Sequence, residues 1–565
     1  MKIIFKLFVI LALCMAMTLA FTSCGDPSNP NENQNQGENI YKIDLSKLPA
    51  SNEENTATFN KSTGTITIDR HGNEQANAGI YCWLDNMDVS AYNIIRIKYE
   101  ALGDVGFNLF VDCTDDSIRW HEKGVYCPSY MTEIVFPITA YPKNFNGLYI
   151  EGAYHTNTEQ FIIKEIAFER VSNPQITNIH LSNAQPVIDT ATQTTIDADA
   201  DAWDFVQELG TGFNYWPFMP SSLDLDFGLD SYNMTGYSRA NAKRDILKIK
   251  KKGFKTIRIQ TNPGNHFIDD EYTIDPRFID DLKNFVDQVI EEDMYVIICG
   301  FFWPLNLRHS QENQNRINPV PYKSAIVNET TKTQSEALLR AFWTQIGKAF
   351  NNSYDEHLIF ETMNEPGDDL HPERDEGHDY PIDLDCSVCQ SDIEIGNGYN
   401  QLIVDTIRAS GGNNANRFIM IAAFGWPYSS YFEMPEDDAT NKLIPITHIY
   451  PLGVEGWETF VYSDEVKNAI TDEFELMDEY FFNEHIPVYV SETGATQAID
   501  MDQRIDMMED FMEEVNKNGR SCNINLWMDP YPKDGNSHFC YYNVRTGQWL
   551  GEEFVNAVIS ATSGN

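Results

Sequence analysis

The chain has 565 residues, of which 42% are hydrophobic and 12% aromatic, so it is long enough for more than one domain and apolar enough for packed cores. Its 85 Asp and Glu residues against 40 Lys and Arg residues give a formal net charge of -45, which disfavours binding to nucleic acid and to anionic membrane surfaces. A neutral polymer is compatible with this charge, which is also explained by solubility alone.

The first residues predict export rather than a folded element. Residues 1–23 form a signal peptide with basic Lys2 and Lys6, an apolar run over 7–20 and small residues before Cys24. This stretch resembles the lipoprotein signals of Gram-negative bacteria, which implies that Cys24 is lipidated. Residues 24–39 are rich in Asn and Gln and are expected to be a flexible tether. The resemblance implies a protein anchored to the cell envelope, at the outer membrane or cell surface, that contacts the membrane only through its lipid.

Residues 40–171 predict an all-β sandwich module. Short strands separated by Asp, Asn, Gly and Ser turns are expected at 65–68, 94–99, 106–111, 133–137 and 161–168. Five aromatic residues either pack in its core or include an exposed platform for sugar rings: Trp83, Trp120, Tyr126, Tyr130 and Tyr149. The module resembles the sandwich domains that accompany polysaccharide hydrolases, which implies carbohydrate binding. Residues 172–202, rich in Ser, Thr, Asn and Asp, are expected to be a linker.

Residues 203–565 alternate strand and helix patterns, which predicts parallel βα units. Phe278, Leu282 and Phe285, for example, recur on one helical face. Candidate strands lie at 210–214, 256–260, 295–298, 359–362, 418–422, 445–449, 488–490 and 523–527. This number fits a (β/α)8 TIM barrel, a fold of about 200 to over 400 residues. A doubly wound sheet would need a Gly-rich phosphate loop, and the sequence has none. The predicted fold class is therefore α/β, a barrel preceded by an all-β sandwich.

Two of these strands end on a glutamate. In LIFETMNEP the apolar run leads to Asn364 and Glu365, and Pro366 stops the strand because it has no N–H group. In IPVYVSETGA the apolar run leads to Glu492. Catalytic residues of α/β barrels lie at the C-terminal ends of the strands, so we expect both carboxylates in one site. A pair of carboxylates on separate strand ends is what hydrolysis of a glycosidic bond requires.

With these strand ends in view, residues 203–550 resemble the family 5 glycoside hydrolases, retaining enzymes that include many endo-β-1,4-glucanases. GFKTIRIQTNPGNH resembles the motif of the family's second strand, which implies that Arg258 and His266 line the site. LIFETMNEP resembles that of the fourth strand, which implies that Asn364 contacts the substrate 2-hydroxyl and that Glu365 is the catalytic acid and base.

The later strands extend the resemblance. THIYP matches the sixth strand and implies His448 and Tyr450 in the site, while IPVYVSETGA matches the seventh and implies Glu492 as the nucleophile. Near the eighth, NLWMDP places either Trp527 or Met528 at the aromatic platform, depending on a register choice of one residue. Two carboxylates suffice for this chemistry, so no cofactor is implied. The implied ligand is a β-linked polysaccharide or oligosaccharide, with glucan, xyloglucan, mannan and xylan all left open.

The sequence departs from the family pattern after the third strand. It reads ICGFFWP, with Phe301 and Phe302 where relatives carry a His pair, so a polar wall of the sugar site is expected to be missing. Four tryptophans offer replacement stacking surfaces: Trp216, Trp303, Trp426 and Trp457. Two hypotheses follow. The first is an endo-acting glycoside hydrolase with an altered subsite, and the alternative is a cell-surface glycan-binding protein with a weakened or inactive barrel.

The cysteines leave their chemistry open. Removing Cys14 and Cys24 from the 10 cysteines leaves 8, which permits disulfides in an exported protein. Cys386 and Cys389 form a CxxC near His371 and His378, but this spacing is not a strong zinc template, so no metal is predicted there. A loop disulfide and free thiols remain as alternatives.

Overall fold

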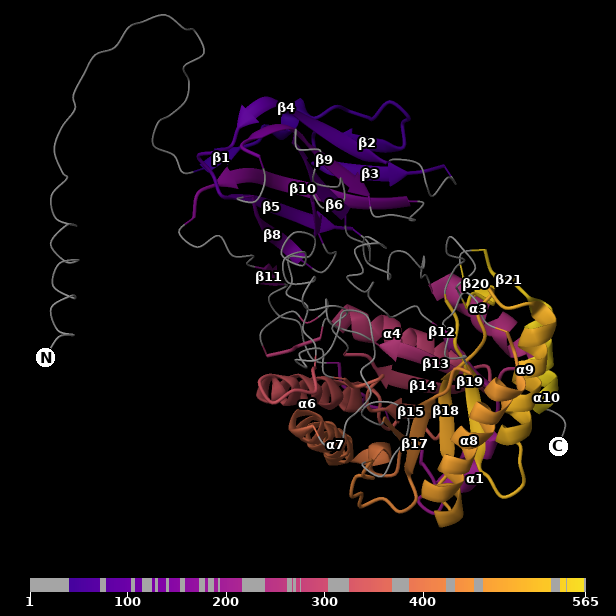
Figure 1. Cartoon of the computed structure of the whole chain (residues 1–565). Helices are drawn as coiled ribbons and strands as arrows, with labels where there is room; N and C mark the ends of the chain where they lie inside the picture. Colours follow the sequence, from indigo (N-terminus) through magenta and orange to yellow (C-terminus); the bar gives the residue numbers. More distant parts are fainter. Residues whose placement is uncertain are drawn as a thin grey trace, which may run out of the picture. The chain divides into compact units, whose positions relative to one another are not determined.

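The computed structural model gives the arrangement of most of the chain between residues 40 and 562 (Figure 1). The described residues are 40–71, 78–102, 107–113, 124–127, 131–138, 142–152, 158–171, 178–180, 187–191, 194–215, 239–261, 267, 271–274, 276–302, 325–367, 386–422, 432–451, 461–529, 539–544 and 546–562. The predicted signal peptide, Cys24 and the tether lie outside them.

The C-terminal part of the chain forms a closed parallel barrel of eight strands, which confirms the predicted (β/α)8 fold. Its strands, in order around the barrel, are β12 (Gly212–Tyr215), β13 (Thr256–Thr261), β14 (Tyr295–Gly300), β15 (Leu358–Glu361), β16 (Ile419–Ala422), β17 (Leu443–His448), β18 (Val488–Thr493) and β19 (Cys522–Leu526). Parallel pairing of β12 with β19 closes the barrel. All eight predicted strands are present because each is a short apolar, β-branched run that the barrel buries.

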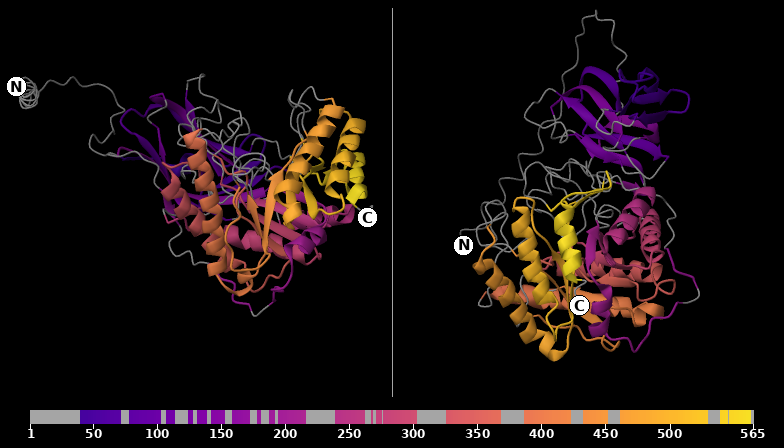
Figure 2. Two further views of the ribbon diagram at one scale, coloured as in Figure 1. Left: turned by 60° about the horizontal axis from the view of Figure 1, so that its bottom comes forward. Right: turned by 90° about the vertical axis from the view of Figure 1, so that its right-hand side faces the viewer.

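Helices cover the outside of the barrel (Figure 2). They are α3 (Arg239–Lys252), α4 (Pro276–Ile290), α6 (Lys332–Ala349), α7 (Ser387–Ala409), α8 (Asp464–Tyr480), α9 (Met501–Val515) and α10 (Glu552–Thr562). The helix α1 (Ala202–Leu209) packs instead against the N-terminal ends of the strands, where Phe205 contacts Phe418 and Tyr295. Short 3-10 turns lie at Gly412–Ala415 and Phe482–Glu484, and a small hairpin joins β20 (Tyr542–Asn543) to β21 (Gln548–Trp549). The predicted apolar face of α4 is confirmed, since Leu282 and Phe285 are fully buried in the barrel core. None of the described helices is both long and apolar enough to cross a membrane.

The N-terminal region is built from strands, as expected, in two antiparallel sheets that share one buried core. The larger sheet has the order β11 (Asn178–His180), β8 (Met131–Pro137), β5 (Ile94–Ala101), β10 (Thr158–Glu169), β3 (Thr65–Asp69) and β2 (Ala57–Asn60), with β1 (Ile40–Lys42) paired to β10; a 3-10 turn spans Leu45–Lys47. The smaller sheet has the order β4 (Gly79–Asp88), β9 (Asn144–Gly152), β6 (Phe107–Cys113) and β7 (Gly124–Cys127).

The segment expected to be a linker contains ordered contacts. Its residues 178–180 form β11, which pairs with β8. Further along, the Asp189 carboxylate accepts hydrogen bonds from the backbone N–H groups of Asn351 and Ser353, at 3.2 and 2.6 Å, and from the Ser353 hydroxyl at 2.6 Å. The Asp189 N–H donates to the carbonyl of Lys348. These contacts fix the segment to the loop before β15. The acidic run that follows ends in a helix cap, because Asp201 accepts the N–H of Trp203 at the start of α1.

Candidate active site

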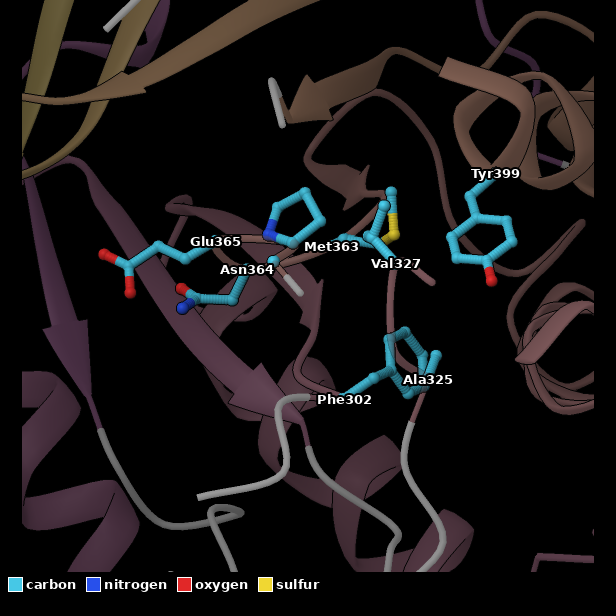
Figure 3. A pocket seen from close by; sticks show the side chains of 9 residues that line it. Phe302, Ala325, Val327, Met363, Asn364, Glu365 and Tyr399 are labelled. Atoms are coloured by element: carbon cyan, nitrogen blue, oxygen red, sulfur yellow. The ribbon is translucent and has the colours of Figure 1, made fainter. Parts of the chain in front are cut away.

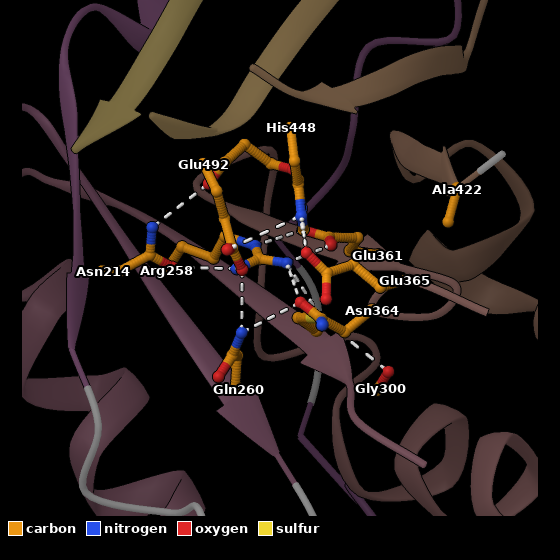
Figure 4. Close-up of polar contacts among 12 residues, drawn as sticks. Asn214, Arg258, Gln260, Gly300, Glu361, Asn364, Glu365, Ala422, His448 and Glu492 are labelled. Atoms are coloured by element: carbon orange, nitrogen blue, oxygen red, sulfur yellow. Dashed lines mark hydrogen bonds and ion pairs between the residues drawn. The ribbon is translucent and has the colours of Figure 1, made fainter. Parts of the chain in front are cut away.

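Polar side chains from several strands meet at the C-terminal end of the barrel (Figure 4). They come from β12 (Asn214), β13 (Arg258 and Gln260), β15 and the loop after it (Glu361, Asn364 and Glu365), β17 and the residue pair after it (His448 and Tyr450) and β18 (Glu492). Parallel strands all point their carboxyl ends to the same rim, so residues far apart in the sequence converge there. The structure thus brings together six of the predicted site residues with Asn214, Gln260 and Glu361.

Arg258 is the centre of this cluster and is completely buried. Its guanidinium donates Nε and Nη2 to the two oxygens of Glu361, at 2.7 and 2.5 Å, in a two-pronged ion pair. Its Nη1 donates to Glu492 at 2.7 Å and to Asn214 at 2.9 Å. Hydrogen bonds therefore fix the orientation of the guanidinium group, and the position of Arg258 determines where its positive charge lies relative to Glu492.

Glu492 is almost fully buried, at 3% exposure, and accepts hydrogen bonds from three side chains. Arg258 and Gln260 donate to its Oε1, at 2.7 and 2.8 Å, and the Tyr450 hydroxyl donates to its Oε2 at 2.9 Å. Burial raises the pKa of Glu492, whereas the charge of Arg258 and the Tyr450 hydrogen bond oppose that rise. Burial and the nearby carboxylate raise the pKa of Tyr450 well above its usual range, so its hydroxyl keeps the proton it donates.

Glu365 is the more accessible carboxylate of the pair, with 20% of its side chain exposed. Its backbone has a φ of 34°, in the left-handed region that a non-glycine residue enters only at a cost of about 1–3 kcal/mol. In Figure 3 its carboxylate points away from the apolar side chains of Phe302, Val327 and Met363, which line a small pocket beside the loop. The loop therefore directs Glu365 towards Glu492 and away from the core.

His448 links the two carboxylates. Its Nδ1 lies 2.6 Å from Oε1 of Glu365 and 3.5 Å from Oε2 of Glu492. Burial lowers the pKa of His448 to about 4, so the ring is neutral at neutral pH. A neutral ring and a carboxyl group share one proton across the short contact, which lies either on Glu365 or on Nδ1. This bond keeps Glu365 in place in either state.

Asn364 has one orientation. Its Oδ1 accepts hydrogen bonds from Arg258 and from Gln260, each at 2.9 Å, and its backbone N–H donates to the carbonyl of Gly300. Because both donors contact Oδ1, the amide cannot flip without losing them. Its NH₂ group is left to donate to a bound molecule beside Glu365.

Phe301 and Phe302 are both buried, at 6% and 4% exposure. The Phe302 ring packs edge-on against Phe342 of α6, with ring centroids 4.9 Å apart. A Cβ on Gly300 would lie 2.5 Å from this ring, so the glycine is what admits it. The sequence predicted that a polar wall is missing at these positions, and the structure shows that the Phe302 ring is part of the hydrophobic core.

The remaining predicted site residues are His266 and the aromatic residues considered for stacking against sugar. At the eighth strand, Trp527 is partly exposed just after β19 while Met528 is fully buried, so the tryptophan is the residue available to a ligand. His266 and Trp303 lie outside the described residues, as do Trp216, Trp426 and Trp457, the other tryptophans considered for stacking.

Among the described residues, one group of side chains has the geometry to hold a cation. One ligand atom each from Glu365, His448 and Glu492 lie within 4.8 Å of one another. However, Arg258 places a fixed positive charge against Glu492, which opposes a second cation, and the His448 nitrogen already contacts Glu365. The arrangement therefore fits proton transfer better than metal binding.

The eight cysteines of the described chain form no disulfides with one another. Cys386 lies at the N-terminal cap of α7, and Cys389 is buried in that helix.

Sequence patterns did not predict three residues that contact the other members of the cluster: Glu361, Gln260 and Cys299. Glu361 ends the apolar run of β15 and appears in sequence as a strand boundary, but it is fully buried against Arg258. Gln260 alternates with Arg258 along β13, and the period of two places both on the inner face of the barrel. Applying this alternation to each strand would have predicted Gln260.

Known proteins resemble the barrel region of this chain. The family model described as Cellulase (glycosyl hydrolase family 5) matches residues 223–529. Endoglucanase B of Ruminococcus albus is 30% identical over 375 residues, which cover 64% of this chain and 81% of that protein. Endoglucanase 1 of Ruminococcus albus is 31% identical over 381 residues, which cover 66% and 83%.

Solved structures share the fold. A complex of a glycoside hydrolase 5 lichenase mutant from Caldicellulosiruptor sp. F32 with cellotetraose has a TM-score of 0.55 and 23% identity, covering 67% of this chain and 100% of that one. A broad specificity endoglucanase from Ruminococcus champanellensis with bound cellotriose has a TM-score of 0.52 and 25% identity, covering 65% and 100%.

Proposed function

The chain belongs to glycosyl hydrolase family 5, the cellulase family, and is a glycoside hydrolase, and we propose that it cleaves β-1,4-linked plant polysaccharide at internal bonds with retention of anomeric configuration. Endoglucanases are its relatives in sequence, and cello-oligosaccharides are bound by the structures it resembles. A β-linked oligosaccharide or polysaccharide is therefore its ligand class. Glucan, xyloglucan, mannan and xylan are the candidate polymers.

The observation that carries the proposal is the spacing of two carboxylates in unlike surroundings. An oxygen of Glu365 lies within 4.8 Å of an oxygen of Glu492. Retaining enzymes hold their carboxyl groups about 5–5.5 Å apart, whereas inverting enzymes need about 6.5–9.5 Å to admit a water between them. The short spacing supports direct attack by one carboxylate on the sugar.

The surroundings support one role for each carboxylate. Glu492 accepts hydrogen bonds from Arg258, Gln260 and Tyr450, which favour its charged form and hold it still, as a nucleophile requires. Glu365 is more accessible and shares a proton with the neutral His448 ring, so it suits proton delivery to the leaving oxygen.

The reaction proceeds in two displacements. Glu365 donates its proton to the glycosidic oxygen, the bond from that oxygen to the anomeric carbon breaks, and a Glu492 oxygen bonds to the carbon. The leaving chain diffuses away. Glu365, now a carboxylate, removes a proton from water, whose oxygen attacks the anomeric carbon and frees Glu492. The NH₂ group of Asn364 donates to the sugar 2-hydroxyl, which aligns the sugar during both steps.

The alternative, a barrel that binds glycan without cleaving it, has no specific observation in its favour. Described hydrogen bonds hold both Glu365 and Glu492 in place, and the Phe302 ring packs against Phe342 of the core.

We extend the proposal to the location of the enzyme. The signal-like residues 1–23 and the polar stretch 24–39 support export and lipid attachment at Cys24. Mass spectrometry of the N-terminal peptide from envelope fractions should find a lipid-modified Cys24, and Cys24→Ala should move the protein to the soluble fraction. An unmodified Cys24 in an exported protein would refute lipid anchoring without affecting the proposed activity.

The activity is tested by reducing-sugar release from soluble β-glucan, xyloglucan, mannan and xylan, with Glu365→Gln and Glu492→Gln run in parallel. We expect cleavage of at least one polymer and a loss on the order of 10³-fold or more in each variant, because neither proton delivery nor attack can be replaced. Proton NMR of the first-formed product should show the β-anomer. An α-anomer would refute retention, and full activity in either variant would refute the assigned roles.

A further inference from the structure

The smaller sheet of the N-terminal region carries aromatic rings on the face that points away from its core. Along β4, Ile80 and Cys82 point into the shared core, so the alternation of a strand places Tyr81 and Trp83 on the opposite face. Cross-strand pairing puts Tyr149 of β9 beside Tyr81. The same face therefore collects rings from two neighbouring strands.

Two of these rings lie across glycines. Trp83 pairs with Gly147 and Gly79 pairs with Glu151 in the register of β4 and β9. A Cβ placed on Gly147 would overlap the Tyr81 ring, and one placed on Gly79 would lie 2.6 Å from Cζ of Tyr149. Each tyrosine ring therefore lies along the sheet with one side against glycine backbone. Covering a glycine is a known structural use of an aromatic ring, and it accounts for both tyrosines.

Trp83 has no such explanation. Trp83 is 71% exposed, which makes it the most exposed large hydrophobic residue of the described chain. Its ring contacts Tyr81, with centroids 4.3 Å apart and planes tilted by 57°. The strand irregularity that follows it contains Asp85 and Asn86, both with positive φ, and such bulges redirect neighbouring side chains. The local backbone thus holds an indole in solvent against its hydrophobic preference.

Hydrogen-bonding groups border the rings. The Tyr81 hydroxyl donates to the carboxylate of Asp112, and the Asn146 amide lies 3.4 Å from the other oxygen of that carboxylate. Flat apolar rings next to acceptor and amide groups match a pyranose, which offers C–H groups on its faces and hydroxyls around its edge. An acidic group at this position, on a chain of formal charge -45, opposes nucleic acid and anionic lipid.

We propose that Tyr81, Trp83 and Tyr149, with Asp112 at their edge, form a second glycan-binding site that takes successive sugar rings of a neutral β-linked polysaccharide chain. Its ligand class rests on the proposed function, since a polymer that the barrel cleaves is the polymer such a site would retain. Trp83 supplies the main stacking surface, and the two tyrosines extend it along the sheet. The site holds polymer without taking part in hydrolysis.

The test uses the full chain with Glu492→Gln as the background, so that polymer is bound and not consumed. Affinity electrophoresis in gels containing soluble β-glucan or xyloglucan compares this protein with the same protein carrying Trp83→Ala. Leu102→Ala is the matched control, because Leu102 is 49% exposed and lies after β5 in the other sheet. We expect Trp83→Ala to weaken retention roughly tenfold or more, because burial of one indole face against a sugar contributes about that factor to the affinity. Leu102→Ala should leave retention unchanged.

Activity measurements separate this inference from the proposed function. In the active chain, Trp83→Ala should leave hydrolysis of a short cello-oligosaccharide unchanged, since the barrel is intact. Equal retention of the Trp83→Ala and control proteins on every polymer would overturn the second site, even with hydrolysis confirmed. Reduced retention in a chain that hydrolyses nothing would overturn the proposed function and leave the second site standing. A change of oligomeric state on Trp83→Ala, with retention unaffected, would identify the face as a protein interface and overturn the glycan site.

Discussion

Replacing Glu361 by Gln tests whether the buried pair with Arg258 organises the active site. The side chains of both residues are 0% exposed, and the carboxylate accepts from both Nε and Nη2 of the guanidinium. A glutamine offers one acceptor oxygen and one NH₂ group, so one guanidinium N–H would face another donor. The lost charge-assisted bond costs about 1.5–3 kcal/mol and the unsatisfied donor about 1–3 kcal/mol. Together they predict a loss of roughly 3–5 kcal/mol in the free energy of unfolding, as expected for breaking a buried ion pair.

The Glu361→Gln substitution should also lower the catalytic rate. Arg258 also holds Oε1 of Glu492, so a guanidinium that shifts to relieve the donor conflict displaces the proposed nucleophile. Misplacement by about 1 Å costs on the order of 100-fold in rate. Removing a neighbouring negative charge leaves Arg258 less neutralised, which lowers the pKa of Glu492. The acidic limb of kcat/KM against pH should therefore move to lower pH.

Thermal unfolding and steady-state kinetics measure these effects. We expect Tm to fall on the order of 5 °C and kcat to fall by at least about tenfold in Glu361→Gln. Glu394→Gln makes the same change of charge at an exposed position of α7 and should alter neither quantity. A Glu361→Gln enzyme with unchanged Tm and kcat would refute the view that this pair positions Glu492.

Three further perturbations have defined outcomes. His448 has a folded-state pKa of about 4, below its usual 6.5, so its contribution to stability is present above pH 6.5 and is lost as the pH falls towards 4. Urea denaturation should show that His448→Asn removes about 3 kcal/mol of the rise in unfolding free energy between pH 4 and pH 6.5. An unchanged pH dependence in this variant would contradict the lowered pKa. Gly300→Ala should force the Phe302 ring to move, costing about 1–3 kcal/mol and lowering kcat through the loop that Gly300 supports, whereas wild-type values for both would show that the ring relaxes freely. Thiol titration of the denatured protein without reductant should count Cys386 and Cys389 among the reactive groups, and their protection would indicate a disulfide that the structure lacks.

The barrel could be predicted because each of its strands can be recognised from its own residues. Runs such as those before Glu365 and Glu492 are short, apolar and rich in β-branched residues, and the residue types that follow them change abruptly. Strand ends in a parallel barrel share one rim, so knowing the ends was enough to predict that these two carboxylates meet. The helical faces of the barrel were equally readable, since their apolar period of about 3.6 is carried by the local sequence.

The parts that were not predicted depend on contacts between distant residues. Pairing of Arg258 with Glu361 requires the register of the three neighbouring strands β13, β14 and β15, which neither strand encodes alone. Phe302 was assigned to the site because of its place after β14, but its environment is decided by a glycine two residues earlier and by a ring from α6. In the N-terminal region, β4 interleaves polar and aromatic residues and contains an irregularity, which hides its periodicity.

The hydrogen bonds of Asp189 define where mechanical load enters the barrel. Tension on the chain before Asp189 would be borne by its contacts with Asn351, Ser353 and Lys348 before it reached α1. These partners precede β15, whereas Glu365 follows that strand, so the point of attachment and the catalytic rim lie at opposite ends of the same strand. An enzyme pulled from its N-terminal side would therefore be loaded at the end of β15 opposite to Glu365.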